Sequence, residues 1–329
     1  MVGSPARSSV RQKITMLKYI GRRLLLTVPT LLLAFTMIFF MIHLIPGDPA
    51  ELMLGDMATP AALQHIRTQL SLDKPLEVQF LTWLLKVAHG DLGVSIVRQQ
   101  PVLQLVISSF GVTASLVLPA VALAALIAIP AGAAAGWKQN SRSDVLIVST
   151  ATLILSIPSF WLGLMFLLVF GVELNLLPVV GYVSPLHDFW QGIRYLVMPV
   201  TCLALIEAGV MLRLLRSSVI QVSRLEYITA ARAKGLSEST VLRRHALPNA
   251  MGPTWTMLGL TLGSLLGGAV VTETVFSLPG LGRLLVESIF ARDYPVIQGC
   301  MLVIAVCYVG ANLLVEVTYP LLSPGLGHD

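Results

Sequence analysis

Six apolar segments dominate this chain, and each is close to the roughly 20 residues that a helix needs to cross the hydrocarbon of a bilayer. Of its 329 residues, 55% are hydrophobic and 12% are charged, and the mean hydropathy is +0.81. A soluble domain does not sustain this composition. We therefore predict an all-α membrane protein in which neighbouring helices accommodate prolines such as Pro158. The predicted spans cover approximately residues 24–44, 113–136, 145–172, 195–215, 251–274 and 296–321.

The placement of lysine and arginine predicts the orientation of these spans. The segment before the first span carries six basic residues and no acid, and the loop after the fourth span is also strongly basic. The positive-inside rule places both in the cytoplasm. We therefore expect cytoplasmic tails at residues 1–23 and 322–329, an extracytoplasmic loop at 45–112 and a membrane core at 113–321 that contains a cytoplasmic hairpin at 223–248.

The long outer loop is expected to fold into helices of its own. Thr59 followed by Pro60 indicates the start of one helix, and Pro75 the start of another that ends at Gly90. Apolar residues along the second helix, among them Phe80 and Trp83, form a stripe. This stripe either packs inside the outer subdomain, or contacts a partner or the membrane surface.

The cytoplasmic hairpin carries helix signals at both ends. Ser223 and Glu226 have the spacing of a capping box, and Gly235 supplies a residue that accepts positive φ. Ser237 can cap a second helix, which we expect to break at Pro248. Four residues at helical spacing give the first helix one small, mostly apolar face, which can dock into a partner's groove. These residues are Tyr227, Ala230, Ala231 and Lys234.

No catalytic or metal-binding pattern is present in the sequence. Gly132 to Lys138 does not have the spacing of a Walker A motif, and no HExxH or GxSxG motif occurs. The three cysteines lie in apolar stretches and form no CxxC pair. The net charge of +5 comes from a few basic loops, so it does not indicate a nucleic-acid partner. We expect no enzyme activity, no metal and no cofactor on this chain.

Two features inside the predicted spans are candidates for a translocation path. Glu207 lies in the middle of the fourth span, where an ionisable group is costly and is a functional candidate by default. It either lines a polar path or makes a structural hydrogen bond to a neighbouring helix. In the fifth span, small residues repeat every four positions and either pack tightly against a helix or face a conduit. These are Gly259, Gly263 and Gly267, with Ser264 beside them.

The hairpin resembles the EAA loop of ABC importer permeases. Thr229-Ala230-Ala231, Gly235 and His245-x-Leu247-Pro248 follow the pattern EAA-x3-G-x9-I-x-LP, with Thr in the Glu position and His in the Ile position. Further segments resemble the dipeptide, oligopeptide and nickel branch of that family, the dipeptide-permease B type. They are Ile45 to Ala50, Leu72 to Pro75, Gly90 to Ser95, Ile157 to Trp161, Arg213 to Ser218 and Glu273 to Gly282. The resemblance covers roughly Leu17 to Tyr319, but Leu322-Ser323-Pro324-Gly325 replaces the family's usual Asp-Pro-Arg.

This resemblance implies a type I ABC importer fold and a set of partners. They are a second permease subunit, two ATP-binding subunits that use ATP and Mg²⁺, an extracytoplasmic solute-binding protein and membrane lipid. The expected substrate is a di- or oligopeptide, with nickel, an opine or glutathione as alternatives. A secondary transporter is the other class, although it would normally show internal repeats. The residues expected to couple to the ATPase are Glu226, Tyr227, Thr229, Ala230, Ala231, Arg232, Lys234 and Gly235.

Overall fold

The computed structural model describes residues 5–44, 49–54, 59–69 and 73–322. These residues form helices, and within them the only β-structure is an isolated bridge between Val94 and Pro101. The predicted all-α class is therefore confirmed. The resemblance motif Ile45 to Ala50 lies mostly outside the described residues, as do Leu72 and the departure at 323–325.

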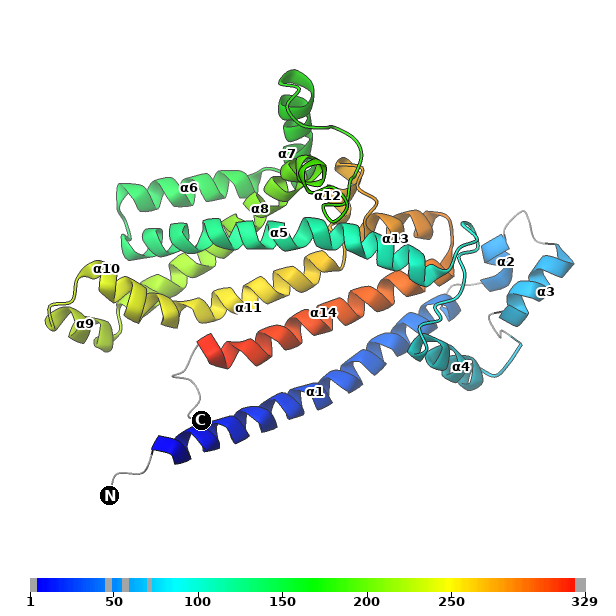
Figure 1. The fold of residues 1–329 in the computed structure, drawn as a ribbon, viewed down its shortest axis with the longest axis horizontal. Coiled ribbons are helices and arrows are strands. Elements are labelled where there is room, and N and C mark those ends of the chain that lie inside the picture. Colours follow the sequence, from blue (N-terminus) through cyan, green and yellow to red (C-terminus); the bar gives the residue numbers. More distant parts are fainter. Residues whose placement is uncertain (1–4, 45–48, 55–58, 70–72, 323–329) are drawn as a thin grey trace.

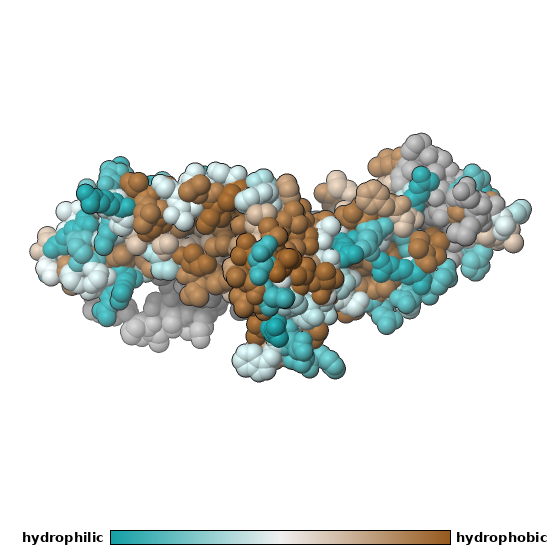
Figure 2. Space-filling model, turned by 90° about the horizontal axis from the view of Figure 1, so that it is seen from above, coloured by the Kyte–Doolittle hydropathy of each residue, from teal (hydrophilic) through white to brown (hydrophobic). Residues whose placement is uncertain are grey.

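Four long helices run along the molecule. They are α1 (Pro5–His43), α5 (Val102–Trp137), α8 (Phe189–Ser223) and α14 (Tyr294–Leu322). Each contains a stretch that is long and apolar enough to cross a membrane, and α1 joins most of the predicted tail and the first span in one helix. In the space-filling view hydrophobic residues dominate the middle of the molecule and hydrophilic residues gather towards its two ends (Figure 2).

The predicted third span is not one straight helix. It is divided into α6 (Arg142–Ser156) and α7 (Ser159–Phe166), the latter continuing as the π-helical segment η2 (Leu167–Glu173), and the two parts are bent by 94°. Ile157 is extended, with φ −87° and ψ 127°, because a residue before proline is pushed away from the helical region. Pro158 therefore ends the helix instead of being accommodated within it. The bent pair can still count as a single span, which makes a fifth.

The predicted fifth span is also interrupted. Helix α11 (Leu247–Leu266) has 20 residues and is not among the helices that meet the length and hydropathy test in the described part of the chain. Its C-terminus is followed by Gly268 at φ +127°, after which α12 (Val270–Val275) begins. The glycines, threonines and prolines of α11 lower its hydropathy, so six separate membrane helices remain a prediction.

The main core lies between α5 and α8. Alanine, leucine and valine side chains of both helices form one continuous buried cluster. Gly132 and Gly136 let the two backbones approach closely, since a Cβ on Gly136 would lie 2.8 Å from the carbonyl oxygen of Arg216. The C-terminal part of α5 is therefore held directly against α8.

The predicted outer subdomain contains α2 (Pro49–Leu54), α3 (Pro60–Gln69) and α4 (Leu76–Ala88). The backbone amide of Ala62 donates to the Thr59 hydroxyl at 3.3 Å, and Pro75 is the N-cap of α4, so both predicted helix starts are confirmed. Phe80 and Trp83 pack against Phe39 of α1, with ring centroids 5.3 and 5.6 Å apart. The apolar stripe on α4 is thus partly covered by α1 of the same chain.

The two ends of the molecule are distinct. Helices α2 to α4 lie at one end, and α9 (Glu226–Ala233) and α10 (Glu238–Thr240) lie at the other, towards which both termini point (Figure 1). Helix α13 (Leu281–Phe290) lies towards the same end as α2 to α4 and packs against α5 and α14. The hairpin and the outer subdomain are therefore separated by the length of the helical bundle.

Candidate functional site

The hairpin has a small apolar core of its own. Ile228 and Ala231 of α9 are buried against Val241 and Ala246 of the following helical segment. The indole of Trp137, the last residue of α5, packs against the same cluster. Because apolar burial is the main force that orders such a short segment, the hairpin is attached to the end of α5 rather than hanging freely from α8.

The capping box prediction at Ser223 is wrong. Ser223 is the last residue of α8, and its hydroxyl donates to the carbonyl of Ile220 at 2.8 Å. Helix α9 starts at Glu226 after Leu225, and no side chain caps it. Helix α8 continues further than the sequence signal suggests, because a serine hydroxyl can bond within the last helical turn as well as cap the next helix.

The predicted turn at Gly235 is confirmed, since its φ is +78°. The predicted break at Pro248 is wrong. The chain continues from α10 through the π-helical segment η3 (Val241–Ala246) into α11, with Pro248 in the first turn of α11. Proline has no backbone N–H. It is tolerated at this position because a residue that follows a π-helical segment does not make the usual α-helical hydrogen bond. Ser237 lies at the N-cap of α10, but its hydroxyl is hydrogen-bonded to the Thr240 hydroxyl at 2.8 Å and does not cap a backbone N–H.

The predicted coupling residues divide between an exposed and a buried face. Ala231 is 6% exposed and faces the core of the hairpin. Its predicted neighbours on one face point outward instead, with Tyr227 41% exposed. The outward set comprises Glu226, Tyr227, Thr229, Ala230, Arg232, Lys234 and Gly235.

Charged contacts hold the turn of the hairpin. The Arg232 guanidinium donates to both carboxylate oxygens of Glu238, at 2.9 and 3.2 Å, and lies 5.0 Å from the centroid of the Trp137 ring. The hydrogen bond from Arg232 lowers the pKa of Glu238 below its ordinary value. Partial burial raises the pKa of Tyr227 above its ordinary value. The turn therefore has a fixed shape and a mixed-charge surface.

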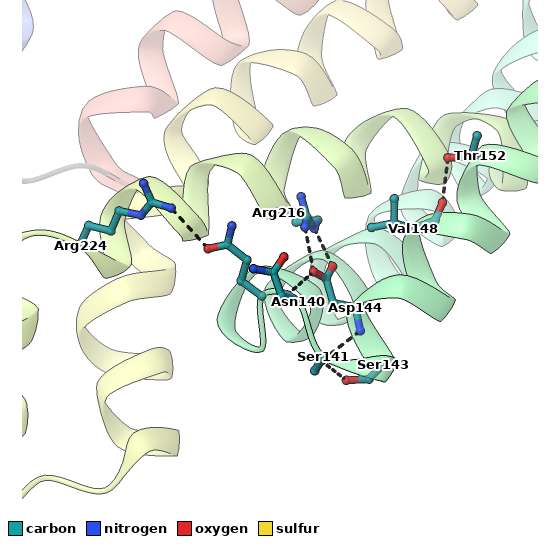
Figure 3. Close-up of polar contacts among 9 residues, drawn as sticks. Asn140, Ser141, Ser143, Asp144, Val148, Thr152, Arg216 and Arg224 are labelled. Carbon is teal, nitrogen blue, oxygen red and sulfur yellow. Dashed lines mark hydrogen bonds and ion pairs between the residues drawn. The ribbon is translucent and has the colours of Figure 1, made fainter.

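A buried ion pair connects the two sides of the bundle just above the hairpin. Arg216 of α8 donates to both oxygens of Asp144 in the first turn of α6, at 2.6 and 2.8 Å (Figure 3). The backbone amide of Asn140 donates to the same carboxylate at 2.9 Å, and Ser141 caps α6. Sequence reasoning missed this pair because the residues are 72 positions apart. An acidic residue next to the basic loop after the second span was the only available signal.

The candidate path residues lie between helices. Glu207 of α8 has the side chain of Thr261 on α11 as a hydrogen-bond partner. Gly259 and Gly263 face α14, because a Cβ on either would meet Val315, or Tyr308 and Ala311. A Cβ on Gly267 would meet Ile304, which is also on α14. Ser264 is exposed on another face of α11. The structure thus brings the glycines together against α14 and leaves Glu207 and Ser264 elsewhere.

Two buried carboxylates organise the end of the molecule opposite the hairpin. Glu273 accepts a hydrogen bond from the Thr113 hydroxyl at 2.6 Å and another from the backbone amide of Arg283 at 2.9 Å. Asp293 accepts from the Ser95 hydroxyl and from the backbone amide of Ile96. Both carboxylates link segments far apart in the sequence, which is why no local pattern indicated them.

The described residues do not supply a metal site, because no three His, Cys, Asp or Glu side chains come together among them. The arrangement supports a mechanical role. A hairpin with an exposed mixed surface is attached through Trp137 to the end of α5, and Asp144–Arg216 links α6 to α8 nearby. These helices include ones that are apolar enough to cross a membrane.

Comparison with known proteins identifies the family. The model for the binding-protein-dependent transport system inner membrane component matches residues 128–328, and the model for its N-terminal part matches residues 16–117. The chain belongs to this family. The hairpin and the candidate path residues fall within the larger of the two matches.

Several proteins that are similar to this chain are named as permeases of transport systems. A putative peptide transport system permease protein of Brucella suis is 40% identical over 94% of this chain and 98% of the relative. A dipeptide transport system permease protein of Alkalihalophilus pseudofirmus is 39% identical over 94% and 99%. A glutathione transport system permease protein of Salmonella paratyphi A is 41% identical over the same shares. Such components are multi-pass membrane permeases and not enzymes.

Proposed function

We propose that this chain forms part of the translocation path of an ATP-driven importer for di- or oligopeptides. The peptide and dipeptide permeases that resemble it over nearly their whole length support this substrate class. The similar glutathione permease makes glutathione, itself a small peptide, the second candidate. The importer would contain a second permease, two ATP-binding subunits that hold ATP and Mg²⁺, and an extracytoplasmic binding protein. Six spans with both termini in the cytoplasm complete the proposal.

The hairpin is the proposed coupling element, and its exposed face carries this proposal. Glu226, Tyr227, Ala230 and Lys234 are available to a partner, whereas Ala231 packs inward and would hold the hairpin to Trp137. A short helix presented in this way suits a groove on another protein. Closure of the ATPase subunits would move the hairpin, and Trp137 would pass that movement to α5 as a switch between two states.

The proposed path runs along the helices that face the second permease. Ser264, exposed on α11, would lie on it, and Glu207 would lie beside it with Thr261 as its partner. The glycines Gly259, Gly263 and Gly267 would contribute by fixing α11 against α14. Substitution of Ser264 by Phe should then slow uptake without loss of assembly.

The decisive experiment is co-purification of the tagged chain from membranes with its ATPase subunits. Gly235→Asp should abolish co-purification and uptake while the chain stays in the membrane, because Gly235 adopts a φ of +78° that other residues rarely accept. Ser239→Asp provides the matched control, since it adds the same charge at an exposed helical position four residues away. Normal peptide uptake by Gly235→Asp, or isolation of the wild-type chain without any ATPase, would refute the proposal.

A further inference from the structure

A polar cavity of about 400 Å³ lies near the outer end of the bundle. It is formed by the turn before α5, the outer part of α5, the loop before α8, the loop after α12, and α13. Its polar lining residues are Arg98, Ser109, Tyr182, Ser277, Arg283 and Glu287. None of these residues belongs to the hairpin or to the candidate path that the sequence suggested.

The charges in this cavity form a bridged cluster. One carboxylate oxygen of Glu287 accepts from Nη2 of Arg98 at 2.8 Å, and the other accepts from Nε of Arg283 at 2.8 Å. A guanidinium has five N–H donors, so each arginine keeps further donors after this contact. Counted alone, these three side chains carry one positive charge in excess, and two guanidinium groups that share one carboxylate have donors left for a second.

Hydrogen bonds to buried acidic residues fix the backbone at both arginines, directly at Arg283 and through Ser95 at Arg98. The backbone amide of Arg283 donates to Glu273, which is fully buried. The backbone amide of Arg98 donates to the hydroxyl of Ser95 at 2.9 Å, and that hydroxyl donates to the buried Asp293. Such supporting contacts are what a preorganised binding site requires.

Backbone strain gathers around the same cavity. Five non-glycine residues of the described chain have positive φ, and three of them are Gln99, Ser277 and Arg292. Ser277 lines the cavity, Gln99 follows Arg98, and Arg292 precedes Asp293. Residues in such conformations persist only where the surrounding structure imposes them, and they cluster at ligand-binding sites.

An apolar groove of about 730 Å³ adjoins the polar cavity. Tyr182 lines both, and its hydroxyl lies 3.1 Å from the Ser115 hydroxyl of α5. The groove is lined by side chains of α5 and α8 such as Leu118, Phe189 and Val200. A charged pocket beside an apolar groove matches a small molecule that carries a carboxylate next to an apolar side chain.

We propose that Arg98 and Arg283 bind the C-terminal carboxylate of a short peptide while the side chain of its last residue occupies the adjoining groove. This inference rests on the proposed import function and adds a substrate site on the permease itself. The site lies at the end of the bundle opposite the hairpin, where a peptide would first meet this subunit.

The test uses the assembled complex of permeases and ATPase subunits in lipid nanodiscs, without the binding protein. A dipeptide of alanine and a diazirine analogue of leucine is photo-crosslinked, and the labelled segments are mapped by mass spectrometry. Label should fall on residues 108–119 and 181–200, and Ala-Leu should displace the probe about tenfold better than Ala-Leu amide, the usual effect of one charge-assisted hydrogen bond. The double substitution of Arg98 and Arg283 by Gln should reduce labelling by about the same factor, and replacement by Lys should reduce it less.

The matched control is Lys86→Gln, which removes an exposed positive charge from α4, at the same end of the molecule, and does not line the cavity. It should label like the wild type. Equal labelling of the Gln double variant, or equal competition by the amide, would overturn the proposal. Retained co-purification of the ATPase subunits with the Gln double variant shows that this variant is folded. Failure of the wild type to co-purify with them would instead count against the import function.

Discussion

The ion pair between Asp144 and Arg216 should contribute measurably to the stability of the bundle at the end that carries the hairpin. The Asp144 side chain is 3% exposed and the Arg216 side chain 27%. Breaking a fully buried pair by removing one partner costs about 3–5 kcal/mol. Because water still reaches Arg216, we expect the lower value, about 3 kcal/mol, for Asp144→Asn.

A double-mutant cycle tests this value. Asp144→Asn, Arg216→Met and the double variant are purified in mixed micelles, and unfolding by SDS is followed by tryptophan fluorescence. The double variant should be more stable than the sum of the single losses predicts, by about 2 kcal/mol, because it leaves no charge without a partner. The control is the cycle for the exposed pair Arg98–Glu287, which should couple by less than about 1 kcal/mol.

The outcome that would refute this reasoning is a coupling energy below about 0.5 kcal/mol for Asp144 and Arg216, the level at which independent sites add. Such a value would mean that the first turn of α6 is held by Ser141 and by apolar packing alone. Uptake by the same variants adds a functional measurement, since the pair links α6 to α8, the helix that leads into the hairpin.

Three further predictions concern α5 and the hairpin. Gly136→Ala should destabilise the protein in thermal unfolding, because the new Cβ would lie 2.8 Å from a backbone oxygen of α8, whereas Gly111→Ala on the same helix should have little effect because nothing lies within 4 Å. Trp137→Ala should cost about 2–3 kcal/mol and should leave ATP hydrolysis running with reduced peptide uptake, as measured in proteoliposomes. Since Arg232 lowers the pKa of Glu238, the stabilisation from this pair should persist above the ordinary value of 4.5 and disappear as the pH falls through the lowered pKa. Hydrogen exchange of the turn should therefore differ between wild type and Glu238→Gln at pH 6, and the difference should shrink steadily as the pH falls below 4.5. A difference that does not shrink on acidification would contradict the assignment.

Local signals in the sequence predicted the features that depend on neighbouring residues. The all-helical class followed from the apolar runs, the helix starts at Pro60 and Pro75 from proline placement, and the turn of the hairpin from Gly235. The position of the hairpin between two apolar segments followed in the same way. Each of these features is determined by the backbone preferences of a few consecutive residues.

Features that depend on distant residues could not be predicted. The carboxylates of Asp144, Glu273 and Asp293 find their partners 72, 160 and 198 residues away, respectively. The bend at Pro158 shows a different limit, because a proline within an apolar run is compatible with a continuous membrane helix or with a break. Only the packing of α7 away from the line of α6 decides between them.

The close approach of α5 to α8 at Gly132 and Gly136 has a consequence for the amplitude of any motion. With 36 residues, α5 extends from Trp137 beside the hairpin to Val102 near the outer cavity, and it is about 54 Å long at 1.5 Å per residue. Because α5 is held against α8, a small rotation at one end of α5 becomes a larger displacement at the other end. If α5 and α8 move together, a tilt of about 5° at the hairpin end would sweep the far end of α5 through about 5 Å. An angular change too small to disturb the packing around either glycine is thus large enough to open or close a pocket that holds a single carboxylate.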